Sequence, residues 1–194
     1  IGDSALQLMT LDLGQGFGST SLSGNVAIGG YASYHVGRDN NNSYGNTQVG
    51  TEAGYYTTGS FNTFFGFKSG RGGTTSAPYS SGQNNTAIGY QALTAFTTGT
   101  ANTVMGYDAG KEITTGGNNV FIGYQAGESS TDTSNSISIG QGAGRDGDLG
   151  DYTTIMGAFA GLNSTGASNT IIGYSAGFAI AAATHTVLIG AEAG

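Results

Sequence analysis

The chain of 194 residues has the length of one ordinary domain, but it holds 37 glycines, one proline and only 9 % charged residues. Its 11 tyrosines and 9 phenylalanines argue against a disordered chain, because disordered chains are poor in aromatic residues. The net charge of −7 opposes nucleic-acid binding, the lack of cysteine excludes disulfides and thiol chemistry, and the sequence lacks an apolar run long enough to insert in a membrane.

Residues 1–24 are predicted to be a joining segment ahead of the repeats. The first six residues, IGDSAL, match the second half of the repeat unit that fills the rest of the chain. Apolar residues follow in the stretch 6–13, which is predicted to pair as an added strand with the edge of a neighbouring subunit. Local packing within the chain is the alternative for this stretch and for the apolar segment 178–183. The residues assigned to this contact are Ile1, Leu6, Leu8, Leu11 and Leu13.

Residues 25–194 contain about ten copies of a unit that is most often 17 residues long. Each copy is centred on one glycine: Gly29, Gly50, Gly66, Gly89, Gly106, Gly123, Gly140, Gly157, Gly173 or Gly190. Tight glycine turns between β-branched and aromatic residues are typical of short strands, and a repeat of this length buries its apolar side only by stacking on its neighbours. The sequence therefore predicts an all-β protein, a parallel β-solenoid or β-roll stacked into a fibre.

The columns of the repeat predict which side chains face inward. The residue before each central glycine is always large and apolar, so we expect it and the residue two positions earlier to face the core. The residue between them is then expected to form an outward apolar stripe that packs on another chain. The alanine three positions after the glycine indicates a narrow interior, and the glycine indicates a backbone angle or close approach that other residues cannot adopt.

Three further columns have structural interpretations. The aromatic residues after the central glycine, at Phe67, Tyr90, Tyr107, Tyr124 and Tyr174, are interpreted as a stacking ladder, with a ligand-facing strip as the alternative. The recurrent asparagines are predicted to stack and satisfy one another. Threonine pairs in the spacers suggest turn formation, although threonine rows also occur on ice-binding solenoids.

The frame Asn-Thr-x-Ile-Gly-Tyr-x-Ala-Gly recurs at residues 102–110 and 169–177, and residues 85–93 read NTAIGYQAL. These motifs resemble the head repeats of trimeric autotransporter adhesins and the repeats of phage tail fibres and bacterial surface-fibre proteins. The resemblance covers residues 25–194. It implies a parallel β-roll that assembles as a trimer on a cell surface or virion.

Few residues suggest site chemistry, and we predict that the chain is not an enzyme and needs no cofactor. His35 and His185 lie about nine repeats apart and are each expected at the surface or at a joint. The segment 145–151 contains Asp146, Asp148 and Asp151, a candidate calcium site, although a solvated turn is the simpler interpretation. Sequons at Asn41, Asn84 and Asn163 are candidate N-glycosylation sites in exposed spacers.

The sequence as a whole predicts a structural protein, a protomer of an extracellular filament on a cell surface or virion. Half-repeats at both ends indicate either a fragment or head-to-tail stacking of subunits. Phe178, Ile180 and Leu188 are added to the expected assembly contacts. The alternatives are an adhesin-like or glycan-binding rod and, third, an ice-binding solenoid. The expected partners are other copies of the chain, joined head-to-tail or as a trimer, and surface glycans.

Overall fold

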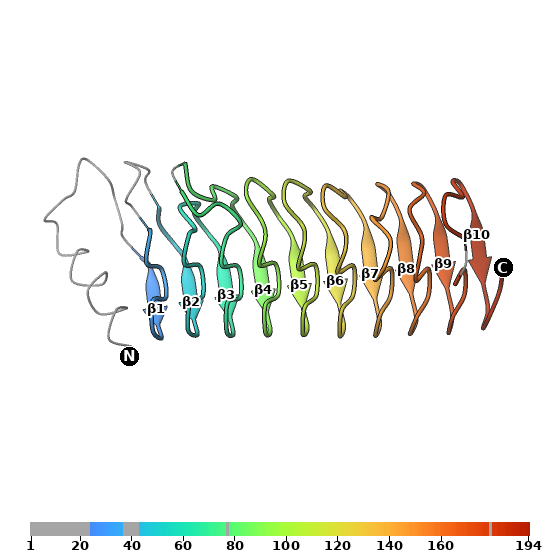
Figure 1. The fold of residues 1–194 in the computed structure, drawn as a ribbon, viewed down its shortest axis with the longest axis horizontal. Helices are drawn as coiled ribbons and strands as arrows, with labels where there is room; N and C mark the ends of the chain where they lie inside the picture. Colours follow the sequence, from blue (N-terminus) through green and yellow to red (C-terminus); the bar gives the residue numbers. More distant parts are fainter. Residues whose placement is uncertain (1–23, 37–42, 77, 179) are drawn as a thin grey trace, which may run out of the picture.

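The computed structural model of the protein describes residues 24–36, 43–76, 78–178 and 180–194. In these residues ten three-residue strands form one parallel sheet in the order β1 to β10, and each strand belongs to one coil of a solenoid (Figure 1). The predicted all-β solenoid is confirmed. The strands are β1 (Val26–Ile28), β2 (Thr47–Val49), β3 (Thr63–Phe65), β4 (Thr86–Ile88), β5 (Thr103–Met105), β6 (Val120–Ile122), β7 (Ile137–Ile139), β8 (Thr154–Met156), β9 (Thr170–Ile172) and β10 (Val187–Ile189).

Neighbouring strands pair in register, so that equivalent repeat positions lie beside one another along the whole rod. Thr63 pairs with Thr86 across the longest spacer, as Thr86 does with Thr103 across a spacer of ordinary length. Pro78 lies exposed in that long spacer, as expected of a surface loop. Insertions therefore leave the sheet undisturbed, because the extra residues are accommodated outside the ladder.

The middle residue of each strand faces the interior, and the prediction that its two neighbours do so is wrong. Val104 and Phe121 are fully buried, whereas Met105, the residue before a central glycine, is 41 % exposed. The polar middle residues Gln48 and Ser138 are buried as well. A three-residue strand places its two outer side chains on one face and its central side chain on the other. A narrow coil has room for the single central side chain.

Small and large side chains from the turns complete the interior. The alanine column is buried as predicted, for example at Ala92 and Ala109. Leu93, Phe96 and Ile113 enter from the turns and join the same core cluster. The buried Ser138 hydroxyl finds a partner inside its own coil, because it donates to the Ala143 carbonyl at 2.6 Å. From the second coil onward the core is thus one column of side chains that continues from coil to coil, while Ala27 and Ala32 of the first coil form a small separate cluster.

The central glycines have the predicted backbone role. Each adopts a φ between 129° and 141°, which other residues rarely adopt. In nine of the ten coils the glycine also lies against the glycine of the next coil: a Cβ on Gly89 would be 2.3 Å from the Gly106 carbonyl oxygen. Both the angle and the close approach therefore require glycine.

The repeated asparagines form a buried hydrogen-bonded row, the asparagine ladder: Asn25, Asn46, Asn62, Asn85, Asn102, Asn119 and Asn169. The Asn102 side-chain amide donates to Asn85 Oδ1 at 3.1 Å and to the Gly116 carbonyl at 2.9 Å. Its own Oδ1 accepts from the backbone and side-chain amides of Asn119. Ser136 and Thr153 occupy the same position in two coils and bond through their hydroxyls. The predicted amide stacking is confirmed.

Candidate functional site

The first and third residues of the ten strands form one outward surface, which we call the sheet face. Its first column is mainly threonine and valine, and its third column is isoleucine, valine, phenylalanine or methionine. Phe65 is 57 % exposed and Ile189 68 % exposed. The predicted apolar stripe therefore exists, but it is formed by the first and third residues of the strands and not, as predicted, by the middle residues. The prediction placed the middle position outward because it assigned the two neighbouring positions to the core.

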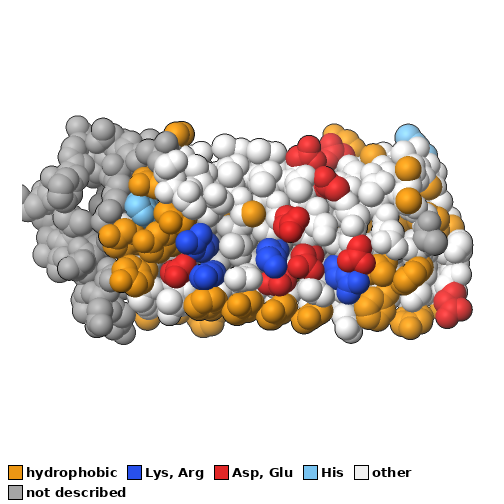
Figure 2. Space-filling model, viewed as in Figure 1, with side chains coloured by type: hydrophobic (Ala, Val, Ile, Leu, Met, Phe, Trp, Pro, Cys, Tyr) orange, Lys and Arg blue, Asp and Glu red, His pale blue; other side chains and the backbone are white. Residues whose placement is uncertain are grey.

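The sheet face carries no charged side chain at any of its positions. The charged residues that the structure describes lie outside the strands, and on the turns Arg71 pairs with Glu52 at 2.8 Å and Lys111 with Asp108 at 3.2 Å. Figure 2 shows the Lys and Arg side chains beside acidic ones along the rod. The acidic character of the chain is thus kept away from the sheet face.

An aromatic ladder follows the third column across the central glycines: Phe67, Tyr90, Tyr107 and Tyr124. The successive ring centroids lie 5.3, 4.9 and 5.2 Å apart and the ring planes are parallel within 14°. The predicted stacking is confirmed for these four rings, while Tyr174 instead meets Phe159 edge-on. All four are exposed, yet their ring faces contact one another. What they present outward is therefore mainly ring edges and phenol hydroxyls.

An aromatic cluster on the first three coils was not predicted. Tyr34 and Tyr55 stack at 4.9 Å, and the guanidinium of Arg71 lies 4.7 Å from the Tyr56 ring centroid. His35 packs between Tyr56 and Tyr79 and is 9 % exposed, so it is not the surface residue we expected. The sequence did hint at this cluster, because Tyr34-His35 and Tyr55-Tyr56 occupy the same position in two consecutive repeats.

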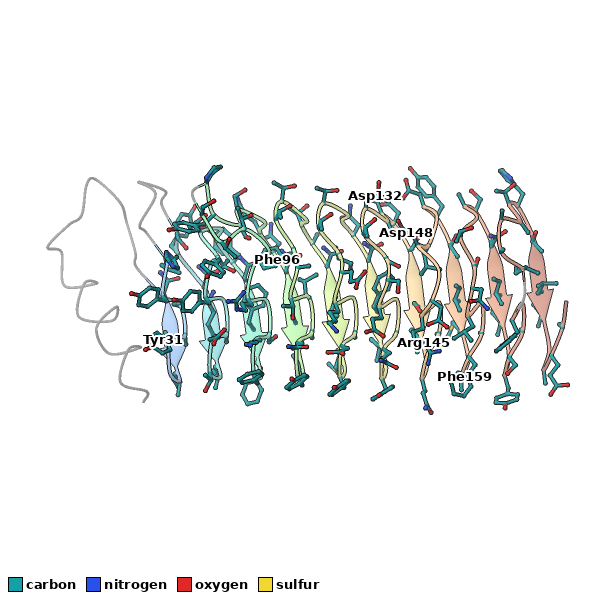
Figure 3. The ribbon with its side chains drawn as sticks, viewed as in Figure 1. Tyr31, Phe96, Asp132, Arg145, Asp148 and Phe159 are labelled. Atoms are coloured by element: carbon teal, nitrogen blue, oxygen red, sulfur yellow. The ribbon has the colours of Figure 1, made fainter. Side chains whose placement is uncertain are left out.

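The three aspartates of the candidate calcium site each bond within the protein. Asp146 pairs with Arg145, whose hydrogen bonds hold the pKa of the Asp146 carboxyl below its usual value. Asp148 accepts from the backbone and hydroxyl of Thr131, and Asp151 from the Ser134 backbone. In Figure 3 Asp148 and Arg145 are separated on the ribbon. Among the described residues no group of three metal-ligating side chains comes together, and the calcium site stays a prediction.

The turn threonines connect successive coils. The Thr97 hydroxyl donates to the Thr114 carbonyl at 3.1 Å, and the Thr114 hydroxyl to the Thr131 carbonyl at 3.0 Å. Thr57 likewise bonds to the Gly70 carbonyl. This geometry supports the interpretation of these residues as structural.

The remaining predicted residues fall into three groups. Leu188 is the inward middle residue of β10 and Ile180 packs on the core, so both are part of the coil interior, while Phe178 is 47 % exposed. Asn84 and Asn163 are exposed, as the sequon prediction requires. The N-terminal contacts Ile1, Leu6, Leu8, Leu11 and Leu13, and the sequon at Asn41, lie outside the described residues.

No family model, curated protein or solved structure matches the chain. In the part of the chain that the structure describes, no helix has the length and hydropathy needed to cross a bilayer.

Proposed function

We propose that the protein is a structural protomer of an extracellular or virion-associated fibre, and that it assembles laterally by packing its sheet face on other copies of itself. The observation that carries the proposal is the sheet face: uncharged, largely apolar and continuous from β1 to β10. Contiguous exposed apolar surfaces of this kind are typical of interaction sites. The β-solenoid fold is compatible with this rod-like role.

The period of the sheet face favours a second copy of the chain as the occupant. A partner that follows the face along all ten strands must repeat at the spacing between strands, about 4.8 Å. Another copy of this solenoid has the same spacing between its strands. A net charge of −7 keeps the copies apart elsewhere, so the uncharged sheet face is where two of them approach at the lowest electrostatic cost.

Longitudinal growth is the second part of the proposal. Successive protomers would stack as successive coils do, through backbone bonds such as that from the Gly106 amide to the Ile88 carbonyl, at 2.8 Å. Such head-to-tail contacts are heterologous and generate open filaments. Coil stacking and lateral packing use different surfaces, so one protomer has room for both.

A charge on the sheet face tests the lateral contact. Phe65→Lys places an ammonium group in the third column, between Val49 and Ile88 of the neighbouring strands. Burying an unpaired charge is costly, so we expect the dissociation constant of the lateral assembly to rise at least about 100-fold. Sedimentation velocity over a concentration series measures it.

Gln83→Lys is the matched control, because it adds the same charge at an exposed spacer position of the next coil. It is expected to assemble as the unmodified chain does. An unmodified chain that stays protomeric at every concentration, or an equal loss in the two variants, would show that the sheet face is not the lateral contact.

A binding rod is the second candidate function, and the exposure of the aromatic ladder favours it. Its ring edges and hydroxyls suit hydrogen bonding to surface glycans, but the ring faces on which sugars stack are already occupied by the neighbouring rings. If this function is correct, Tyr107→Ala abolishes binding to immobilised glycans while Phe65→Lys leaves it intact. Glycan binding that is unchanged by Tyr107→Ala would exclude the aromatic ladder.

A further inference from the structure

Both methionines that the structure describes, Met105 and Met156, occupy the third column of the sheet face. They end β5 and β8 and are 41 % and 40 % exposed. In register, Met105 lies between Ile88 and Ile122 of the neighbouring strands. Because isoleucine occupies the same position in the adjacent coils, packing within the coil does not require a sulfur atom there.

The methionine thioether is the principal site of sulfur oxidation in this chain, because the sequence contains three methionines and no cysteine. A peroxide transfers one oxygen atom to the sulfur and leaves as water: the sulfur is oxidised by two electrons and the O–O bond is broken. The product is a sulfoxide, which is polar, and methionine sulfoxide reductases reverse the reaction. The third methionine, Met9, lies outside the described residues.

Met105 and Met156 lie on the surface, so their oxidation is expected to change that surface and leave the core intact. The inward residues of the same strands are Val104 and Ile155, both fully buried, and neither is oxidisable. A sulfoxide at Met105 or Met156 remains hydrated in a free protomer. In a face-to-face contact its oxygen would have to lose that water among isoleucines, which is unfavourable without a compensating hydrogen bond.

We propose that Met105 and Met156 are modification sites at which peroxide oxidation weakens the lateral contact between protomers while the coils stay folded. This inference rests on the proposed assembly through the sheet face. The two methionines would make the sheet face sensitive to peroxide, whereas the isoleucines at the same position in other coils are not oxidised.

The test oxidises the full chain with hydrogen peroxide at a concentration low enough for protomers to be separate, removes the peroxide with catalase and then concentrates the protein. Peptide mass spectrometry confirms a gain of one oxygen at each methionine. We expect the dissociation constant from sedimentation to rise at least tenfold, with an unchanged melting temperature, and reduction by methionine sulfoxide reductases to restore assembly.

The double variant Met105→Leu, Met156→Leu is the control, since it keeps the face apolar and leaves Met9 as the remaining methionine. It is expected to assemble equally well before and after peroxide. Oxidised unmodified protein that assembles normally, an equal loss in the double variant, or a loss accompanied by unfolding would overturn the inference and leave the proposed assembly standing. Untreated protein that never assembles would overturn the proposed function and the inference with it.

Discussion

Gly106→Ala is expected to destabilise the solenoid by more than about 4 kcal/mol, enough to disrupt the coils around β5. The new Cβ would lie 2.2 Å from the carbonyl oxygen and 2.7 Å from the carbonyl carbon of Gly123. The contacting atoms are backbone, so they move only if β6 separates from β5. The φ of Gly106, 141°, adds conformational strain. Urea denaturation followed by circular dichroism measures the loss.

Gly190→Ala separates the two causes. Gly190 has a φ of 129°, but in a separate protomer a Cβ there meets nothing within 4 Å, so both variants are compared at a concentration at which protomers are separate. This variant should therefore carry the strain of the backbone angle alone, about 1 to 3 kcal/mol. Losses of equal size at Gly190 and Gly106 would mean that close approach between coils contributes nothing, contrary to the geometry described above.

Asn102→Ala is expected to cost about 3 kcal/mol, because it removes hydrogen bonds on both sides of the ladder. The Gly116 carbonyl and the Asn119 backbone amide would lose their partners at 2.9 and 3.1 Å. Asn102 and Asn119 are fully buried, so water does not readily replace these bonds. Denaturation gives the free energy, and amide hydrogen exchange should show the loss of protection concentrated at Asn119.

Asn102→Ser is the control that the chain itself suggests. Ser136 occupies the same position, donates to the Gly150 carbonyl at 3.3 Å and accepts from the Thr153 amide at 3.0 Å. A serine at 102 should therefore recover about half of the loss. If serine and alanine are equally destabilising, the ladder amides act by filling space and their hydrogen bonds contribute little.

The stability variants change residues that flank the strands, and the assembly variants change outward residues of the strands themselves. Val104 faces the core, while Thr103 and Met105 face outward. Changes to the glycine and asparagine columns should therefore lower stability and assembly together. Changes to the sheet face should lower assembly alone, which allows the proposed function to be tested on a folded protein.

Much of this architecture was predictable from periodicity. The in-register repeats required parallel stacking, because equal spacing brings equal residues together at every step. The roles of three columns followed from their residue types. The central glycine allows a positive φ, the alanine fits a small volume, and the asparagine amides can pair with one another. Stacking of Tyr90, Tyr107 and Tyr124 followed from the same register.

The direction in which the strand side chains point was decided by the tertiary structure. Alternation shows that Thr103 and Met105 share a face, but it does not say whether that face is inside, and both the middle column and the third column of the strands are largely apolar. The turns decide it: Leu93, Phe96 and Ile113 fill a narrow interior that accepts the central side chain alone. The aromatic cluster around His35 likewise depends on how the spacers fold, which a repeat frame does not specify.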